Sequence, residues 1–220
     1  MICAIIRRIM TKNDFIFFDF DGVVVDSFRV TFEIHKTVHP HLTEDSYRAC
    51  FEGNINDWKE LNNTHTKECG GDADFFKEYA PRMKNEVKVF PDMTDVIVEL
   101  GKHYTLIVIS STTTAPIQEF LKMHNLENHF IQIMGNDIHK SKVEKIKMVF
   151  EQYDIGAQNC VFVTDTLGDI REAEKMGVGS VGVTWGFHNP ETLHQGKPFR
   201  LIEQPNQLSV AISDYFNTLK

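Results

Sequence analysis

A short apolar run that ends in two aspartates limits most strongly what this chain can fold into. Residues 15–18 read Phe-Ile-Phe-Phe, a composition typical of a strand buried on both faces of a parallel sheet. Asp19 and Asp21 follow at once, and Gly22 allows a sharp turn. Two carboxylates at the end of a buried strand are costly unless a partner such as a metal ion compensates them. An ordinary Asp-Gly turn is the alternative interpretation.

The rest of the chain alternates apolar runs with helical patterns. Such an alternation predicts a Rossmann-like α/β fold, a parallel sheet with helices on both faces. Residues 27–88 show helical spacing and no strand signal, which indicates a small helical insert after the first strand. We therefore expect a core of residues 14–26 and 89–220, a helical cap over 27–88, and a loosely attached segment over 1–13. The later strands are predicted at 105–109, 130–134, 160–164, 181–184 and 200–202.

The composition is that of an ordinary globular protein. The 220 residues are 42% hydrophobic and 25% charged, enough to bury a core. A formal net charge of −8 argues against a broad nucleic-acid-binding surface. No segment has the length of a transmembrane helix, and the four scattered cysteines favour reduced thiols. We expect a cytoplasmic monomer or homodimer without nucleic-acid or membrane partners.

Polar residues end several of the predicted strands. The carboxyl ends of parallel strands share one edge of the sheet, so these residues should converge there, and a lysine from residues 139–142 can reach the same edge. Aspartates, a hydroxyl and a lysine together indicate magnesium-assisted chemistry on a phosphate. The residues at the strand ends are Asp19, Asp21, Ser110, Ser111, Asp165 and Asp169.

With these residues at its strand ends, the sequence resembles the haloacid dehalogenase superfamily, in its phosphatase branch, and is similar to phosphoglycolate phosphatases. The first family motif is present as residues 19–24, Asp-Phe-Asp-Gly-Val-Val, and the second as Ser110. A lysine before a helix is the third, and residues 163–169, Val-Thr-Asp-Thr-Leu-Gly-Asp, are the fourth. The family usually has glycine where Thr164 stands. We treat that departure as minor, because this position is expected to contribute only its backbone.

The resemblance implies a role for each motif residue. Asp19 would be the nucleophile that forms an aspartyl-phosphate, and Asp21 the general acid and base. Ser110 would donate a hydrogen bond to the phosphoryl group. A Mg²⁺ ion would be held by Asp19, the Asp21 carbonyl, Asp165 and Asp169. Without the motif, Ser110 would be interpreted as a helix cap and Asp169 as an early acidic helix residue.

Two lysines compete for the third motif. Aligning residues 140–144, Lys-Ser-Lys-Val-Glu, with the family's Lys-Pro-x-Pro-Glu favours Lys140 as the catalytic lysine over Lys142. Lys142 would then be a solvated residue at the start of a helix. Substrate contacts are expected from Gly22, Ser111 and, in the cap, Asn54.

The expected function is a magnesium-dependent phosphatase acting on a small phosphorylated metabolite of the phosphoglycolate type. In the cap, we interpret Arg48 and Lys59 as solvated rather than as ligands of a substrate carboxylate. A dehalogenase would lack Asp21. A β-phosphoglucomutase-like phosphotransferase remains an alternative, although its cap histidine would fall at Thr31. A catalytically silent, phosphate-sensing or partner-binding protein on the same fold is the other alternative.

Overall fold

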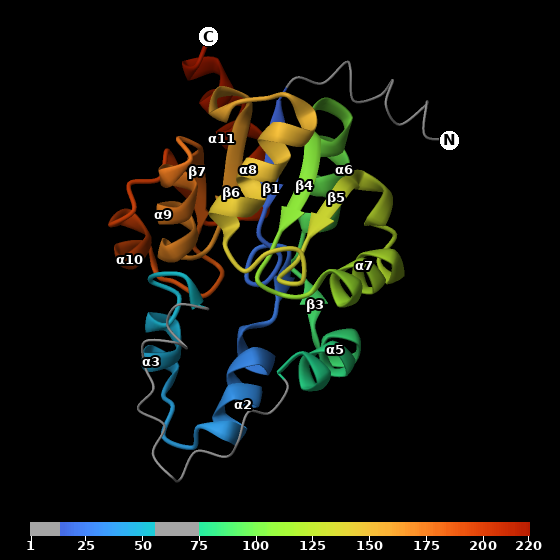
Figure 1. The fold of residues 1–220 in the computed structure, drawn as a ribbon, viewed down its shortest axis with the longest axis vertical. Helices are drawn as coiled ribbons and strands as arrows, with labels where there is room; N and C mark the ends of the chain where they lie inside the picture. The colour runs from blue at the N-terminus through green and yellow to red at the C-terminus, as the bar shows by residue number, and fades with distance from the viewer. Residues whose placement is uncertain (1–13, 56–74) are drawn as a thin grey trace.

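The computed structural model describes residues 14–55 and 75–220. Its main feature is a six-stranded parallel sheet with the order β5-β4-β1-β6-β7-β8 (Figure 1). The predicted α/β fold is therefore confirmed, and β1 lies inside the sheet between β4 and β6. The strands are β1 (Phe15–Phe18), β4 (Thr105–Ile109), β5 (Phe130–Met134), β6 (Cys160–Thr164), β7 (Gly179–Val183) and β8 (Arg200–Ile202).

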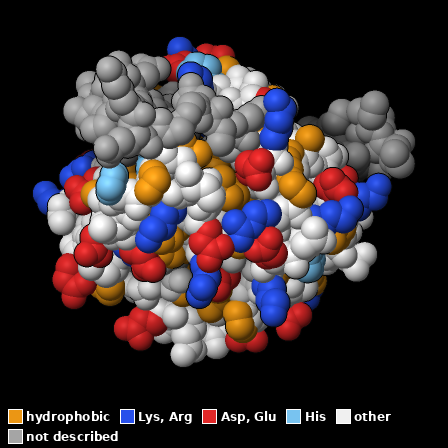
Figure 2. Space-filling view, turned by 90° about the horizontal axis from the view of Figure 1, so that it is seen from below, with side chains coloured by type: hydrophobic (Ala, Val, Ile, Leu, Met, Phe, Trp, Pro, Cys, Tyr) orange, Lys and Arg blue, Asp and Glu red, His pale blue; other side chains and the backbone are white. Residues whose placement is uncertain are grey.

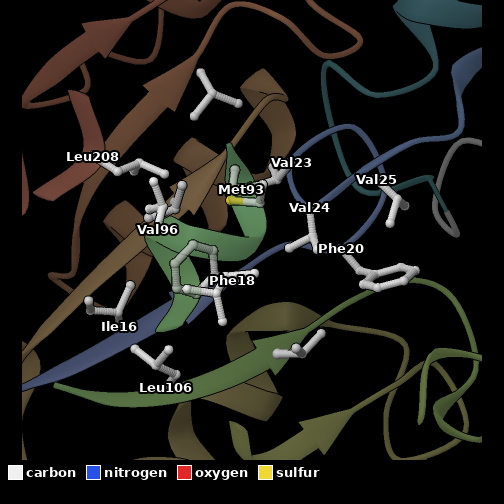
Figure 3. Close-up of a cluster of buried hydrophobic side chains, with 14 of the residues drawn as sticks. Ile16, Phe18, Phe20, Val23, Val24, Val25, Met93, Val96, Leu106 and Leu208 are labelled. Atoms are coloured by element: carbon white, nitrogen blue, oxygen red, sulfur yellow. The ribbon is translucent and has the colours of Figure 1, made fainter. Parts of the chain in front are cut away.

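Helices cover both faces of this sheet because its inner strands are apolar on both. Ile16 and Phe18 of β1 belong to one buried cluster, part of which Figure 3 shows, and Phe15 and Phe17 to another. Alternate residues of a strand point to opposite faces, so β1 contributes to both halves of the core. The first cluster includes side chains from α6 (Met93–His103), α7 (Thr114–Met123) and α11 (Leu208–Thr218), and the second includes side chains from α8 (Lys142–Tyr153) and α9 (Leu167–Lys175).

The helical insert lies beyond the carboxyl ends of the strands (Figure 1). Its described helices are α2 (Phe28–Val38), α3 (Glu44–Ala49) and α5 (Phe75–Glu86). Where the chain leaves and re-enters the core, β2 (Val25–Asp26) pairs antiparallel with β3 (Lys88–Val89). The expectation of no strand in residues 27–88 is wrong at this boundary, because strands of two residues are too short to produce a periodic pattern.

Other differences from the sequence expectations are small. β7 begins at Gly179 rather than at Val181, and α10 (Pro190–His194) forms after the loop that follows it. The segment over 1–13 lies outside the described residues. In the part of the chain that the structure describes, no helix is long and apolar enough to cross a membrane. On the face shown in Figure 2, acidic and basic side chains are interspersed.

Candidate active site

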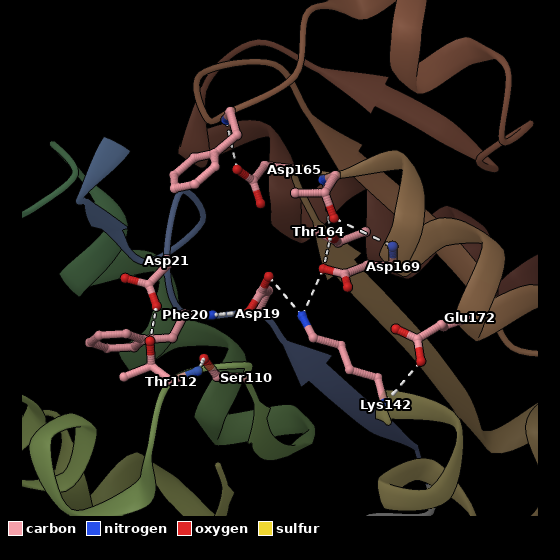
Figure 4. Close-up of polar contacts among 12 residues, drawn as sticks. Asp19, Phe20, Asp21, Ser110, Thr112, Lys142, Thr164, Asp165, Asp169 and Glu172 are labelled. Atoms are coloured by element: carbon pink, nitrogen blue, oxygen red, sulfur yellow. Dashed lines mark hydrogen bonds and ion pairs between the residues drawn. The ribbon is translucent and has the colours of Figure 1, made fainter. Parts of the chain in front are cut away.

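The centre of the site is a lysine held between two carboxylates. Asp19 follows β1 directly, and Asp169 lies in the first turn of α9. The Lys142 Nζ lies 2.8 Å from the Asp19 Oδ2 and 2.7 Å from the Asp169 Oδ2 (Figure 4). All three residues are buried. The neighbouring ends of β1 and β6 thus bring the first and fourth motifs together, as expected for a parallel sheet.

This geometry favours Lys142 as the lysine of the site, whereas the sequence alignment favoured Lys140. Ser141 is the N-cap of α8, so the helix begins at Lys142. The backbone N–H of Lys142 donates to the Glu172 Oε1 at 3.1 Å, and its Nζ lies 5.4 Å from the ring centre of Phe162. These contacts direct the Lys142 side chain along the end of the sheet into the site, where it is 2% exposed. Lys140 precedes the N-cap and is exposed.

Negative charge exceeds positive charge in this cluster, and the pKa values reflect it. Burial raises the pKa of Asp19. The charge of Lys142 lowers this pKa, and the charges of Asp169 and Asp165 raise it further. Burial alone would lower the pKa of Lys142, but Asp169 and Asp19 outweigh it and raise that pKa. Burial would raise the pKa of Asp169, but Lys142 and hydrogen bonds from its neighbours lower it. A divalent cation would relieve the repulsion among the three carboxylates.

Ser110 directly follows β4 and lines the cavity above Asp19. Its carbonyl accepts a hydrogen bond from the Lys145 Nζ at 2.6 Å, and its Oγ accepts one from the N–H of Thr112 at 3.0 Å. The alternative in which Ser110 caps the next helix is wrong, because Thr113 is the N-cap of α7. The hydroxyl hydrogen of Ser110 is not used in these contacts.

Two hydroxyl groups orient the Asp21 carboxylate. The Thr112 Oγ1 donates to the Asp21 Oδ2 at 2.7 Å (Figure 4), and the Tyr79 hydroxyl donates to the Asp21 Oδ1. Tyr79 is buried and lies on α5, so a helix of the insert contacts a core carboxylate. No motif pointed to Thr112 or Tyr79. Both carboxylate oxygens of Asp21 accept these hydrogen bonds, so the backbone carbonyl of Asp21 remains as the expected metal ligand.

Asp165 is buried behind Gly22. The Asp165 Oδ2 accepts a hydrogen bond from the N–H of Phe187 at 2.7 Å. Gly22 has a φ of 76°, and a Cβ atom at this position would lie 1.9 Å from the same oxygen. The absence of a Cβ atom at Gly22 therefore leaves room for the Asp165 carboxylate. Gly22, which was predicted as a substrate contact, is not among the residues that line the cavity.

The other oxygen of Asp165 indicates that a cation fits here. The Asp165 Oδ1 is buried and has no hydrogen-bond partner among the described residues. Such an atom is costly unless a ligand satisfies it, and carboxylate oxygens are the ligands that Mg²⁺ prefers. Within residues 14–55 and 75–220, no three Asp, Glu, His or Cys side chains form a metal cluster on their own. Mg²⁺ commonly binds one or two carboxylates and completes its shell with water.

The side chain of Thr164 takes part in the site, contrary to expectation. Its Oγ1 donates to the Asp169 Oδ2 at 2.8 Å and accepts a hydrogen bond from the N–H of Thr166 at 3.2 Å. The glycine that the related family usually has at this position could make neither contact. Thr164 and Lys142 therefore hold the same carboxylate oxygen of Asp169.

Glu172 is a buried carboxylate that no motif indicated. Besides the N–H of Lys142, its Oε1 accepts a hydrogen bond from the Asn54 Nδ2 at 3.1 Å. Asn54 lines the cavity as expected, and its amide also joins the insert to α9. Glu172 follows Asp169 by three residues on α9, which places both side chains on one face of the helix. This spacing could have indicated Glu172 as a residue of the site.

Most of the predicted site residues line the cavity above Asp19. Lys140 and Asp165 do not line it. Arg48 does not line it either, because its guanidinium lies 3.8 Å from the ring centre of Phe28 and donates to the Phe187 carbonyl. Lys59 lies outside the described residues. The predicted residues that line the cavity are Asp19, Asp21, Asn54, Ser110, Ser111 and Asp169.

Known proteins resemble the chain along most of its length. The sequence model described as haloacid dehalogenase-like hydrolase matches residues 16–183. A phosphoglycolate phosphatase of Synechococcus elongatus is 23% identical over 206 residues, which cover 90% of this chain and 96% of that protein. One from Colwellia psychrerythraea is 24% identical over 226 residues, covering 92% and 98%. The crystal structure of a predicted phosphatase from Clostridium acetobutylicum shares the fold, with a TM-score of 0.73, 20% identity and coverage of 91% and 98%.

Proposed function

The chain belongs to the haloacid dehalogenase-like hydrolase family, and we propose that it is a magnesium-dependent phosphatase that hydrolyses a small phosphomonoester. Its similarity to phosphoglycolate phosphatases over about nine-tenths of its length supports the reaction class. The observation that carries the proposal is the Asp19 carboxylate, which lines the cavity in contact with Lys142.

In this proposal Asp19 is the nucleophile. One of its oxygens attacks phosphorus, the bond between phosphorus and the leaving oxygen breaks, and an aspartyl-phosphate forms. Two displacements of lower barrier thereby replace one difficult displacement. Lys142, already in contact with the attacking carboxylate, stabilises negative charge on the transferred group, and the Ser110 hydroxyl donates to a phosphoryl oxygen.

Asp21 moves the protons in both steps. It first protonates the leaving alkoxide, and it then accepts a proton from the water that attacks the aspartyl-phosphate, which releases phosphate and restores Asp19. The hydrogen bonds from Thr112 and Tyr79 fix the carboxylate that must do this. A dehalogenase would not need this acid, and the ordered position of Asp21 supports an ester with an alcohol leaving group.

Asp19, Asp165, Asp169 and the Asp21 carbonyl would hold Mg²⁺. The buried Asp165 Oδ1 without a partner supports Asp165 as one of these ligands. When bound, the ion would neutralise the repulsion between the Asp19 carboxylate and a phosphate dianion. The chain itself keeps the ligands in place, because Phe187 donates to Asp165 and Lys142 donates to Asp169.

We also propose that residues 27–88 act as a cap domain on a core of residues 14–26 and 89–220. Besides the Asn54–Glu172 and Tyr79–Asp21 contacts, the N–H of Gly168 donates to the Phe51 carbonyl at 2.9 Å. These contacts close the cavity on two sides. A cap that closes excludes water during transfer and admits it for hydrolysis.

The first test is metal dependence. We expect the protein to release phosphate from a panel of small esters that includes phosphoglycolate, to lose this activity in EDTA, and to regain it with excess Mg²⁺. Mg²⁺ should also raise the melting temperature, because a ligand present at 100 times its Kd stabilises the native state by about 2.7 kcal/mol. Asp165→Asn should lose most of this shift, whereas Asp154→Asn, at an exposed turn after α8, should keep it. EDTA-resistant activity, or equal shifts in both variants, would contradict the metal assignment.

A phosphotransferase of the mutase type is the second candidate. Thr31 stands where that reaction's cap histidine was expected, but His35, one turn further along α2, lines the same cavity. Incubation with β-glucose 1-phosphate distinguishes the two functions. Release of free phosphate alone supports the phosphatase, and conversion into glucose 6-phosphate supports the mutase.

A further inference from the structure

The cavity above Asp19 is polar on the core side and aromatic on the insert side. The core lines it with carboxylates and hydroxyls, and the insert lines it with Tyr47, Phe51, Phe75 and Phe76. In phosphoryl transfer the attacking and leaving oxygens lie roughly in line with phosphorus. With Asp19 attacking from the core, the leaving group therefore lies on the insert side, against these rings.

The rings form a packed wall rather than separate side chains. The ring centres of Phe75 and Tyr79 are 5.2 Å apart in a stacked arrangement, and Phe76 meets Phe75 edge to face at 5.4 Å. On the other side, Phe51 meets Tyr47 edge to face at 5.2 Å. Tyr47 and Tyr79 are buried beneath, while Phe51, Phe75 and Phe76 remain partly exposed at the surface of the wall.

Among the described residues neither lysine nor arginine contributes to this wall. Its histidine, His35, is packed between the rings of Tyr47 and Phe75, with ring centres 5.0 and 4.6 Å away. Lys142 is the one lysine or arginine among the described residues that line the cavity, and it contacts Asp19 and Asp169 on the core side. The nearby Arg48 is turned away onto the ring of Phe28. A carboxylate in the leaving group would lose water at the aromatic wall without gaining a lysine or arginine partner from the described residues, which is unfavourable.

We propose that this site prefers phosphomonoesters whose leaving group is an uncharged aromatic alcohol over esters whose leaving group carries a carboxylate. The inference rests on the proposed phosphatase activity and concerns its substrate class. The aromatic ring packs against Phe75, Phe76 and Phe51, where edge-to-face and offset contacts between rings are favourable. The reaction is otherwise unchanged, since ester and water give the aromatic alcohol and inorganic phosphate.

Three esters test the preference. Benzyl phosphate, ethyl phosphate and phosphoglycolate all release unactivated primary alcohols, so they differ mainly in the group that meets the wall. At saturating Mg²⁺ we expect kcat/KM for benzyl phosphate to exceed that for ethyl phosphate about tenfold. It should exceed that for phosphoglycolate about 100-fold. Phosphoglycolate turned over as well as benzyl phosphate would overturn the inference and leave the phosphatase standing. No hydrolysis of any ester would overturn both.

A charge placed in the wall should reverse the preference. Phe76→Lys is expected to lower kcat/KM for benzyl phosphate and raise it for phosphoglycolate, changing their ratio about 100-fold. Phe199→Lys makes the same substitution at a residue of the core that is 38% exposed and does not line the cavity, and it should leave the ratio unchanged. A folded Phe76→Lys protein with the wild-type ratio would contradict the proposal.

A neutral variant covers the case in which Phe76→Lys does not fold. Phe76→Leu keeps an apolar side chain but removes the ring, and it should lower the ratio of kcat/KM for benzyl phosphate to that for ethyl phosphate about fivefold. An unchanged ratio in that variant would also overturn the proposal.

Discussion

Asp19→Asn is expected to reduce kcat on the order of 10⁴-fold or more, because it removes the proposed nucleophile. The asparagine amide is a poor nucleophile at phosphorus. The substitution also removes the negative charge of Asp19 that contacts Lys142. Initial rates of phosphate release with the best ester of the panel, at saturating Mg²⁺, measure the effect.

The same variant should not be less stable than the wild type in metal-free buffer. Asp19, Asp165 and Asp169 are all buried, and the two other carboxylates raise the pKa of Asp19 further than burial does alone. Removing one of three like charges relieves repulsion, so we expect an equal or higher melting temperature. If Asp19→Asn is active, or if it is inactive because it is unfolded, this support for Asp19 as the nucleophile is lost.

Lys142→Met is expected to lower kcat/KM about 10²–10³-fold, while Lys140→Met should stay within about twofold of the wild type. Lys142 contacts both Asp19 and Asp169, and we propose that it stabilises charge on the transferred phosphoryl group. Lys140 is exposed before the N-cap of α8. Parallel kinetics of the two variants decide between the lysines.

The stability of these variants gives an independent measurement. Removing Lys142 leaves two buried carboxylates without their counter-ion, which typically costs about 3–5 kcal/mol. Urea unfolding in EDTA should therefore show a large loss for Lys142→Met and almost none for Lys140→Met. Equal kinetics in the two variants, or a larger defect in Lys140→Met, would restore the sequence-based assignment.

The core fold could be predicted from the sequence because its signals are strong and local. The strands β1, β4, β5, β6 and β8 fall on the predicted residues. The first four are mainly apolar runs ended by polar or turn residues, whereas β8 is the short segment Arg-Leu-Ile. Their parallel pairing then brings Asp19, Ser110 and Asp169 to one edge without further information. Residues placed by strand ends were therefore the predictable part of the site.

Residues placed by helix starts or by the insert were not predictable in the same way. The helix start at Lys142 was expected, but the sequence did not show that the Lys142 side chain is buried and reaches Asp19 and Asp169. The contact from Tyr79 to Asp21 depends on how α5 packs against the core, and no local pattern encodes it. Thr164 was misjudged for a related reason, because its hydroxyl matters only once Asp169 lies beside it.

A trapped phosphoenzyme tests the central claim most directly. In an Asp21→Asn variant, p-nitrophenyl phosphate has a leaving group that needs no protonation, so the first step proceeds while hydrolysis of the intermediate lacks its base. Acid quenching, digestion and mass spectrometry should then find a phosphoryl group on the peptide that contains Asp19, matched by a burst of nitrophenolate of about one equivalent. Nitrophenolate release without a burst and without a phosphoryl group on Asp19 would contradict the account.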